Sequence, residues 1–333
     1  MNRYAVGLAV VIAFSLWANY AYSDELRPAL LSIVELEQNE YEVQLTVPSA
    51  VSNYPDIRPE WPTNCDGSTV DRYTIPNAIH ITKYRVHCPN GLVGQNIRVS
   101  GLNGSFREVL VRFQTLESHT SLSRITSTSP GTQLVGRATW QDTVTTYFVF
   151  GVTHIATGFD HLLFVLTLIL LTTSGRQIAI LITAFTFAHS VTLALGIMQI
   201  IRLPQVFVEA AIALSILMLI AELARQKNGA TSPLSARHQW LIVFIFGLVH
   251  GFGFASALSD SGLPEKDLFS ALVSFNLGIE FGQLIFVILV VGCISLINPI
   301  VSRLPAPIQR TPSSCIGIVA AFWTFERISG FWL

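Results

Sequence analysis

The sequence is poor in charged residues. Asp, Glu, Lys and Arg make up 12% of its 333 residues, about half of their share in an ordinary soluble domain. Hydrophobic residues make up 51%, and together these values exclude a soluble globular enzyme and a disordered chain. The formal net charge is only −1, which excludes a nucleic-acid-binding protein that relies on a strongly basic surface.

The lack of charge is concentrated in one part of the chain. Residues 1–143 contain 24 of the 41 charged residues, whereas the longer stretch 144–333 contains 17, most of them between long apolar runs. This distribution predicts a polytopic α-helical membrane protein with a soluble domain at its N-terminus. We expect a signal peptide in residues 1–23, an exported domain in residues 24–143 and a transmembrane domain in residues 144–333.

The first 23 residues have the pattern of a secretory signal peptide. A short positive region at Asn2-Arg3 is followed by the apolar stretch Ala5–Trp17 and by Ala21-Tyr22-Ser23, a small-x-small cleavage site. An uncleaved anchor is the alternative. In both cases the residues that follow are delivered outside the cytoplasm, which for a bacterial inner-membrane protein means the periplasm.

The exported domain has the pattern of β-strands. Apolar and polar residues alternate over Ser32–Glu37 and Tyr41–Val47, on either side of Gln38-Asn39-Glu40, which predicts a hairpin. Val109–Phe113 and Gln95–Val99 are further candidate strands, so we expect a small antiparallel β-sandwich. This domain is also the candidate docking site for a periplasmic partner.

Cysteine is rare, with four residues in the chain. Cys65 and Cys88 both lie in the exported domain, where disulfides persist, so we expect a bridge between them. Cys293 and Cys315 lie in apolar segments and are expected to pack there as small hydrophobic side chains.

Six apolar segments are candidate membrane spans. Prolines fall between these segments or at their ends, where a missing N–H group costs little. Lys and Arg residues in the intervening loops, six on the cytoplasmic side against three outside, agree with an exported N-terminal domain. The predicted spans are residues 146–173, 177–200, 206–224, 239–259, 268–298 and 313–330.

Ionisable side chains interrupt these apolar spans. Such groups are costly in hydrocarbon and are usually functional. Imidazole and carboxylate ligands without thiolate or thioether suit nickel, zinc or cobalt, with protons as the rival cargo. Five of these side chains lie within about three residues, or about 5 Å, of the midpoints of four spans: Asp160, His161, His189, His250 and Glu280.

His154 restricts how the first span can be used. On an ideal helix His154 and His161 share a face but lie about 10 Å apart along the axis, too far for one metal ion with bonds of about 2 Å. Either the helix breaks near Gly158, or the two histidines serve successive sites along a pathway. Asp160 is then a ligand or fixes the tautomer of the His161 imidazole.

Polar residues on other spans are candidates for a secondary pathway. Asn276, Glu280 and Gln283 form a stripe on one helix face, although Asn276 and Gln283 can equally serve in interhelical hydrogen bonds. Glu209 lies near the outer end of its span. It is either the entry point of a cation pathway or an acidic residue at the membrane interface.

The surroundings of these residues lead to further expectations. Gly247 and Gly251 flank His250 and predict that a partner helix approaches closely there. Two pairs near span ends are expected to be local and solvated: Glu222 with Arg225, and Glu326 with Arg327.

The first span contains the string His154-Ile-Ala-Thr-Gly-Phe-Asp160-His161. This H-x5-D-H motif, with four later blocks in the same order, resembles the HupE/UreJ family of nickel-permease-like membrane proteins, particularly its branch with an exported N-terminal domain. The resemblance covers about residues 144–330. The later blocks are Ala184–Leu193, Val208–Ser215, Gly247–Ala255 and Phe275–Gln283.

The resemblance implies metal uptake or metal handling, with His154, Asp160 and His161 as ligands. The sequence departs from the family pattern around His250. The nickel transporters carry F-H-G-x-A-x-E, whereas this chain has Ala255 in the position of the acid. Glu280 on the next span is the candidate replacement, so the preference for nickel over zinc or cobalt stays open.

Two functions agree with these residues. A transporter for a divalent transition metal holds its ion near the bilayer midplane, and the outward displacement of His154 and Glu209 favours such a pathway. The alternative is an intramembrane zinc-dependent hydrolase, in which three histidines and an aspartate leave one coordination position for water and Ser190 polarises a substrate. A scaffold whose polar cluster only joins helices is a third possibility. The expected partners are the lipid bilayer and a metal ion, and no nucleic acid.

Overall fold

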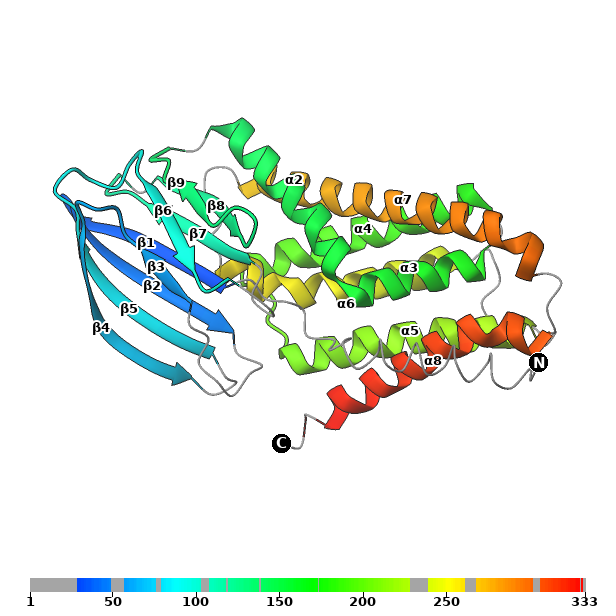
Figure 1. Cartoon of the computed structure of the whole chain (residues 1–333). Coiled ribbons are helices and arrows are strands. Elements are labelled where there is room, and N and C mark those ends of the chain that lie inside the picture. The colour runs from blue at the N-terminus through cyan, green and yellow to red at the C-terminus, as the bar shows by residue number, and fades with distance from the viewer. Residues whose placement is uncertain are drawn as a thin grey trace. The chain divides into compact units, whose positions relative to one another are not determined.

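A computed structural model gives the fold of most of the chain (Figure 1). The chain divides into two compact units, one within Asp24–Val149 and Ala257–Ser274 and the other within Phe150–Ser256 and Phe275–Leu333. The predicted signal peptide lies outside the described residues. The structure describes residues 29–48, 57–75, 79–102, 108–117, 119–137, 139–172, 174–227, 239–260, 268–301, 306–329 and 331.

Two β-sheets make up most of the first unit. The larger has six strands in the order β4-β5-β2-β1-β7-β8, and the smaller has three in the order β3-β6-β9. The strands are β1 (Ala29–Glu37), β2 (Glu40–Pro48), β3 (Arg58–Glu60), β4 (Asp66–Ile75), β5 (Ile79–His87), β6 (Asn96–Ser100), β7 (Glu108–Gln114), β8 (Thr120–Thr126) and β9 (Gly131–Gln133).

The predicted hairpin is confirmed as β1 and β2, which pair antiparallel. Asn39 in its turn has a φ of 68°, and asparagine tolerates this left-handed conformation better than most residues do. The expectation of a purely antiparallel sandwich is wrong, because β1 pairs in parallel with β7. Five strands separate β1 from β7 in the sequence, and such a long connection allows a parallel pairing that a short turn does not.

The core of this unit lies between the two sheets. Leu31 and Ile33 on β1, from the larger sheet, belong to the same buried apolar cluster as Ile97 and Val99 on β6, from the smaller one. Because side chains alternate across a strand, Ala29, Leu31 and Ile33 of β1 all enter this cluster. The arrangement is a β-sandwich in the sense predicted, with one apolar layer enclosed by two sheets.

The disulfide between Cys65 and Cys88 is confirmed. Cys65 directly precedes β4 and Cys88 directly follows β5, and these two strands pair antiparallel. The bridge therefore closes the open end of a β-hairpin. A disulfide here is consistent with an extracytoplasmic location of the sheet domain.

Helices form the rest of the described chain, and each predicted span overlaps one or two of them. By length and composition, α4, α5 and α7 can cross a membrane, and α2 with α3 can form a fourth, broken span. α6 is apolar over the shorter stretch Gln239–Ala255. The seven helices in the described residues are α2 (Trp140–Thr157), α3 (Phe159–Leu171), α4 (Gly175–Ile197), α5 (Gln205–Lys227), α6 (Gln239–Asp260), α7 (Leu268–Val301) and α8 (Ala306–Ser329).

The first predicted span is broken at Gly158. α2 and α3 meet there at an angle of 72°, and Gly158 has the extended backbone angles φ −79° and ψ 90°. The sequence left two possibilities for this span: a helix break near Gly158, or two histidines that serve successive sites. The structure shows the break.

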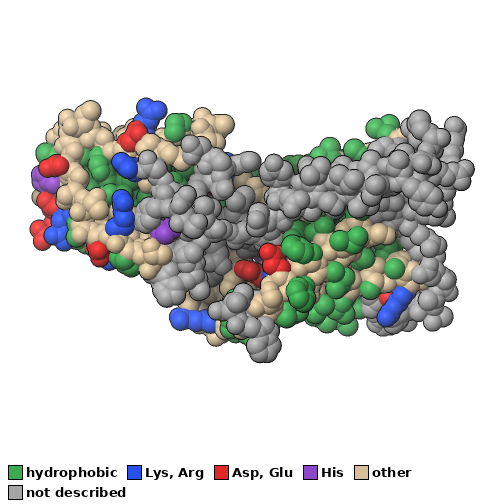
Figure 2. All heavy atoms as spheres, turned by 60° about the horizontal axis from the view of Figure 1, so that its bottom comes forward, with side chains coloured by type: hydrophobic (Ala, Val, Ile, Leu, Met, Phe, Trp, Pro, Cys, Tyr) green, Lys and Arg blue, Asp and Glu red, His purple; other side chains and the backbone are tan. Residues whose placement is uncertain are grey.

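The helices expose apolar side chains, as membrane-spanning helices do. On α7 only 17% of the most apolar window is buried, and Phe269, Ile288 and Leu296 are largely exposed. In the view of Figure 2, apolar side chains cover much of the described helical surface, while the sheet domain carries many charged ones. These exposed faces are suited to contact with lipid.

Two expectations about single residues have different outcomes. Glu222 was expected to be solvated, but its side chain is buried, with 3% of its surface exposed. Cys315 is buried in the helical part as expected, whereas Cys293 is exposed. Hydropathy alone does not reveal which face of a helix points inward, because these helices are apolar on most sides.

We expect loss of the Cys65–Cys88 bridge to lower the free energy of unfolding of the sheet domain by about 3 kcal/mol, because it closes a loop of 23 residues. The measurement is urea unfolding of the full chain in detergent, followed by brief proteolysis, for Cys88→Ser. Cys293→Ser, which removes an unbonded thiol, is the control. Titration of four thiols in unreduced, unfolded protein would contradict the bridge.

Candidate metal centre

Four buried histidines from four helices lie together in the helical unit. They are His154 on α2, His161 on α3, His189 on α4 and His250 on α6. Each of His154, His161 and His189 offers one ring nitrogen such that the three atoms lie within 4.8 Å of one another. This histidine triad could hold a metal ion.

The break at Gly158 brings His154 and His161 together. Their ring centroids are 4.8 Å apart, whereas a continuous helix would separate the residues by about 10 Å along its axis. The α2 helix ends with the Gly158 N–H donating to the carbonyl of His154 at 2.8 Å. His154 therefore sits in the last turn of one helix and His161 in the first turn of the next.

His250 extends the triad by a fourth imidazole. Its ring centroid lies 5.2 Å from that of His161. The Nδ1 atom of His250 donates to the carbonyl of Phe246 at 2.8 Å, since a carbonyl oxygen can only accept. The lone pair of this neutral imidazole is therefore on Nε2, the form that binds a metal.

His189 is oriented in the same way by α7. Its Nδ1 lies 3.3 Å from Oδ1 of Asn276, and the amide oxygen accepts a hydrogen bond from the ring. Such outer partners fix the ring and the tautomer of metal-binding histidines. The interhelical hydrogen bond predicted for Asn276 is confirmed, and it leaves Nε2 of His189 with the lone pair.

Several nitrogens of this cluster have no hydrogen-bond partner within the part of the chain that the structure describes. Buried polar atoms are almost always paired in folded proteins, and exceptions often mark a missing ion or a functional role. Here the exceptions come from four helices, and three of the four histidines offer ligand atoms within 4.8 Å of one another, as a cation site requires. The atoms are Nε2 of His154, both ring nitrogens of His161, Nε2 of His189 and Nε2 of His250.

Phenylalanine rings enclose the cluster. Phe254 lies 4.2 Å from the His154 ring and stacks on Phe275. Phe164 and Phe185 lie 5.2 Å and 4.9 Å from the His250 ring. Such apolar surroundings offer an ion little solvation, so a cation here depends on the side chains of the chain itself.

Close packing of α4 against α6 holds His189 and His250 near each other, as the glycine pattern predicted. A Cβ atom on Gly247 would lie 2.5 Å from the carbonyl oxygen of Phe185, and one on Gly251 would overlap the carbonyl of His189. Only glycine lets the two backbones approach this closely.

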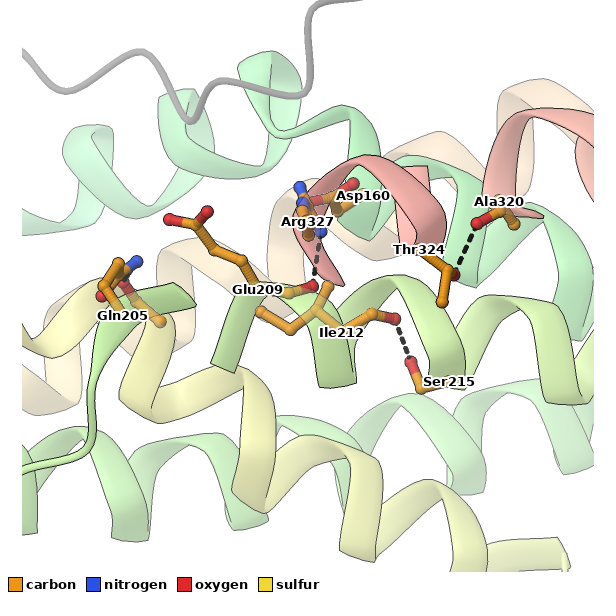
Figure 3. A network of polar contacts seen from close by, with 9 residues as sticks. Asp160, Gln205, Glu209, Ile212, Ser215, Ala320, Thr324 and Arg327 are labelled. Atoms are coloured by element: carbon orange, nitrogen blue, oxygen red, sulfur yellow. Dashed lines mark hydrogen bonds and ion pairs between the residues drawn. The ribbon is translucent and has the colours of Figure 1, made fainter. Parts of the chain in front are cut away.

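Asp160 makes an ion pair that the sequence did not reveal. Nη2 of Arg327, on α8, donates to Oδ2 of Asp160 at 2.8 Å, and both side chains are buried (Figure 3). The expected solvated pairing of Arg327 with Glu326 in an outer tail is therefore wrong. Both ring nitrogens of His161 lack a partner among the described residues, so Asp160 does not fix the tautomer of that ring.

The remaining predicted site residues lie on helix–helix contacts. Thr183 donates to Glu280 at 2.7 Å, and Thr186 donates to Gln283 at 3.2 Å, which joins α4 to α7 and confirms an interhelical role for Gln283. The backbone carbonyl of Glu209 accepts from Nη1 of Arg327 at 2.7 Å. Neither Glu280 nor Glu209 belongs to the group whose ligand atoms converge.

The comparison with known families agrees with the motifs. A family model described as HupE / UreJ protein matches residues 131–327, which is more than half of the 333-residue chain. The matched region contains all four histidines of the cluster as well as Asp160. No curated protein matches the chain significantly.

Gly251→Ala is expected to destabilise the helical unit by about 1–3 kcal/mol, because the added methyl group forces α4 and α6 apart. The measurement is thermal unfolding in detergent. Gly292→Ala on α7 is the matched control, since nothing lies within 4 Å of its added Cβ; it is expected to be neutral or slightly stabilising. Equal unfolding temperatures for the two variants would contradict the close packing.

Gly158→Ala is expected to disturb the cluster locally. Its Cβ would lie 3.0 Å from Nδ1 of His161 and 2.8 Å from the carbonyl of His154, so the His161 ring must shift. We expect metal affinity to fall about tenfold, as when an outer partner of a ligand is lost, measured by equilibrium dialysis. Gly175→Ala, where the added Cβ meets nothing, is the control, and equal affinities in the two variants would contradict this geometry.

Proposed function

Since the chain belongs to the HupE/UreJ family, we propose that it transports a divalent transition-metal ion across the bacterial inner membrane. The observation that carries this proposal is the buried histidine triad, with three ligand atoms within 4.8 Å of one another. His154, His161 and His189 are the primary ligands in this proposal, and His250 is the fourth imidazole within reach.

The ligand types narrow the choice of ion. Neutral imidazole nitrogens bind nickel, cobalt and zinc well, whereas calcium and magnesium prefer oxygen ligands. Hydrogen bonds to Asn276 and Phe246 hold His189 and His250 with Nε2 free for coordination. The substrate class is therefore the borderline divalent metals, and the order of preference among nickel, cobalt and zinc is left to measurement.

The broken helix supports transport rather than hydrolysis. Secondary transporters commonly hold their substrate where a membrane helix is discontinuous, and His154 and His161 flank such a break at Gly158. The hydrolase alternative relied on His161, His189 and His250 around one ion, but the set whose ligand atoms converge contains His154 instead of His250. A cluster enclosed by phenylalanine rings also favours an ion held away from water.

The sheet domain is proposed to lie in the periplasm. Its disulfide is stable in an oxidising compartment, and the positive-inside bias of the sequence gives the same orientation. In this position the domain can meet ions or a periplasmic partner before the helical part does. The predicted signal peptide of residues 1–23 is the proposed means of export.

His161→Ala is expected to abolish metal accumulation by proteoliposomes, because His161 lies at the centre of the cluster, next to His154, His189 and His250. Purified wild-type protein in detergent should retain about one bound nickel, cobalt or zinc ion, and the variant should bind at least about tenfold more weakly. Elemental analysis after dialysis and uptake of each metal are the two measurements.

His87→Ala is the matched control, because His87 pairs with Glu40 on the exposed surface of the sheet domain. It should accumulate metal as the wild type does. Uptake that is unchanged by His161→Ala would contradict the proposed function. Metal binding with hydrolytic turnover and without uptake would favour the hydrolase instead.

A further inference from the structure

The guanidinium group of Arg327, on α8, makes hydrogen bonds to α3 and α5 (Figure 3). Nη2 donates to Oδ2 of Asp160 on α3 at 2.8 Å, and Nη1 donates to the backbone carbonyl of Glu209 on α5 at 2.7 Å. The group also lies 5.9 Å from the ring centroid of Trp323, one turn earlier on α8. These contacts fix both the position and the orientation of the positive charge.

Asp160 and Arg327 depend on each other. Each side chain has only 7% of its surface exposed, and an isolated charge in such a place is strongly unfavourable. Arginine stays protonated under all ordinary conditions, and its Nη2 donates to Oδ2 of Asp160 at 2.8 Å. Lysine has a single charged nitrogen and cannot reach two acceptors on different helices with the same planar geometry.

Only one oxygen of the Asp160 carboxylate has a hydrogen-bond partner among the described residues. Oδ2 accepts from Arg327, whereas Oδ1 is buried and has no hydrogen-bond partner among the described residues. The next residue is His161, whose two ring nitrogens are equally without partners there. A buried carboxylate oxygen without a partner, one residue before a histidine whose ring is also without partners, is suited to a cation and unsuited to an empty apolar space.

We propose that Arg327 is a positioning residue for metal binding: its hydrogen bond to Oδ2 holds the Asp160 side chain in place, so that Oδ1 is left for the ion of the histidine cluster. The inference rests on the proposed metal-binding function and assigns a role to a residue far from the ligand motif. Ligating carboxylates commonly need such a second partner, and its loss typically lowers metal affinity 10–100-fold.

A double-mutant cycle tests whether Arg327 acts through Asp160. The variants are Asp160→Asn, Arg327→Gln and the double variant, and the measured quantity is the dissociation constant for nickel, cobalt or zinc of the full chain in detergent. We expect each single substitution to raise the dissociation constant about tenfold or more. The double variant should bind no more weakly than Asp160→Asn, because Arg327 has nothing to position once the carboxylate is gone.

Two further variants separate positioning from general effects. Arg327→Lys keeps the charge and should lose less affinity than Arg327→Gln. Arg176→Gln removes an exposed arginine of α4, about 20 Å along the helix from His189, and should bind as the wild type does. Thermal unfolding of every variant reports its folding. If Arg327→Gln alone fails to fold, the double variant, which has no unpaired buried charge, is compared with Asp160→Asn.

The outcomes are distinct. Equal dissociation constants for the double variant and Asp160→Asn support the proposal. A further loss of affinity in the double variant, or wild-type affinity in a folded Arg327→Gln variant, would overturn the role of Arg327 while leaving the proposed function intact. Absence of metal binding by the wild-type chain would instead contradict the proposed function itself.

Discussion

The membrane interior offers polar groups no water to bond, and this constraint explains the organisation of the helical unit. Four imidazoles and a carboxylate are buried there, at a cost that only mutual or external partners can offset. Asp160 is paired with Arg327, while five ring nitrogens of the histidines are unpaired among the described residues. A bound divalent cation could take one ring nitrogen from each of the three convergent histidines, which is the physical basis for regarding the cluster as a metal centre.

Three separate features bring these side chains to one place. The break at Gly158 places His154 beside His161. Glycines of α6 let α4 approach, so that His189 and His250 face the same volume. Arg327 joins α8 to α3 and α5 and holds Asp160, the residue before His161. None of these features belongs to the ligand set itself, yet each determines whether the ligands can act together.

Membership of the HupE/UreJ family and the observed geometry support one another, and they also show where this chain differs. Ala255 stands where the nickel transporters of the family have an acid. The expected replacement, Glu280, accepts a hydrogen bond from Thr183 and is not in the convergent group. Asp160 precedes His161 in the sequence and is likewise outside that group, but its side chain is held by Arg327 of α8.

The sequence by itself determined the features that depend on composition and local pattern: the membrane class, the helical segments, the β1–β2 hairpin, the pair Cys65 and Cys88, and the types of ligand. It left two possibilities for the first span, a helix break near Gly158 or two successive sites, because His154 and His161 lie too far apart on a continuous helix to bind one ion. Only the tertiary structure decided between them. It also decided the parallel pairing of β1 with β7 and the partner of Arg327, which is 167 residues from Asp160. Such contacts leave no local signal, because they form only when distant segments pack.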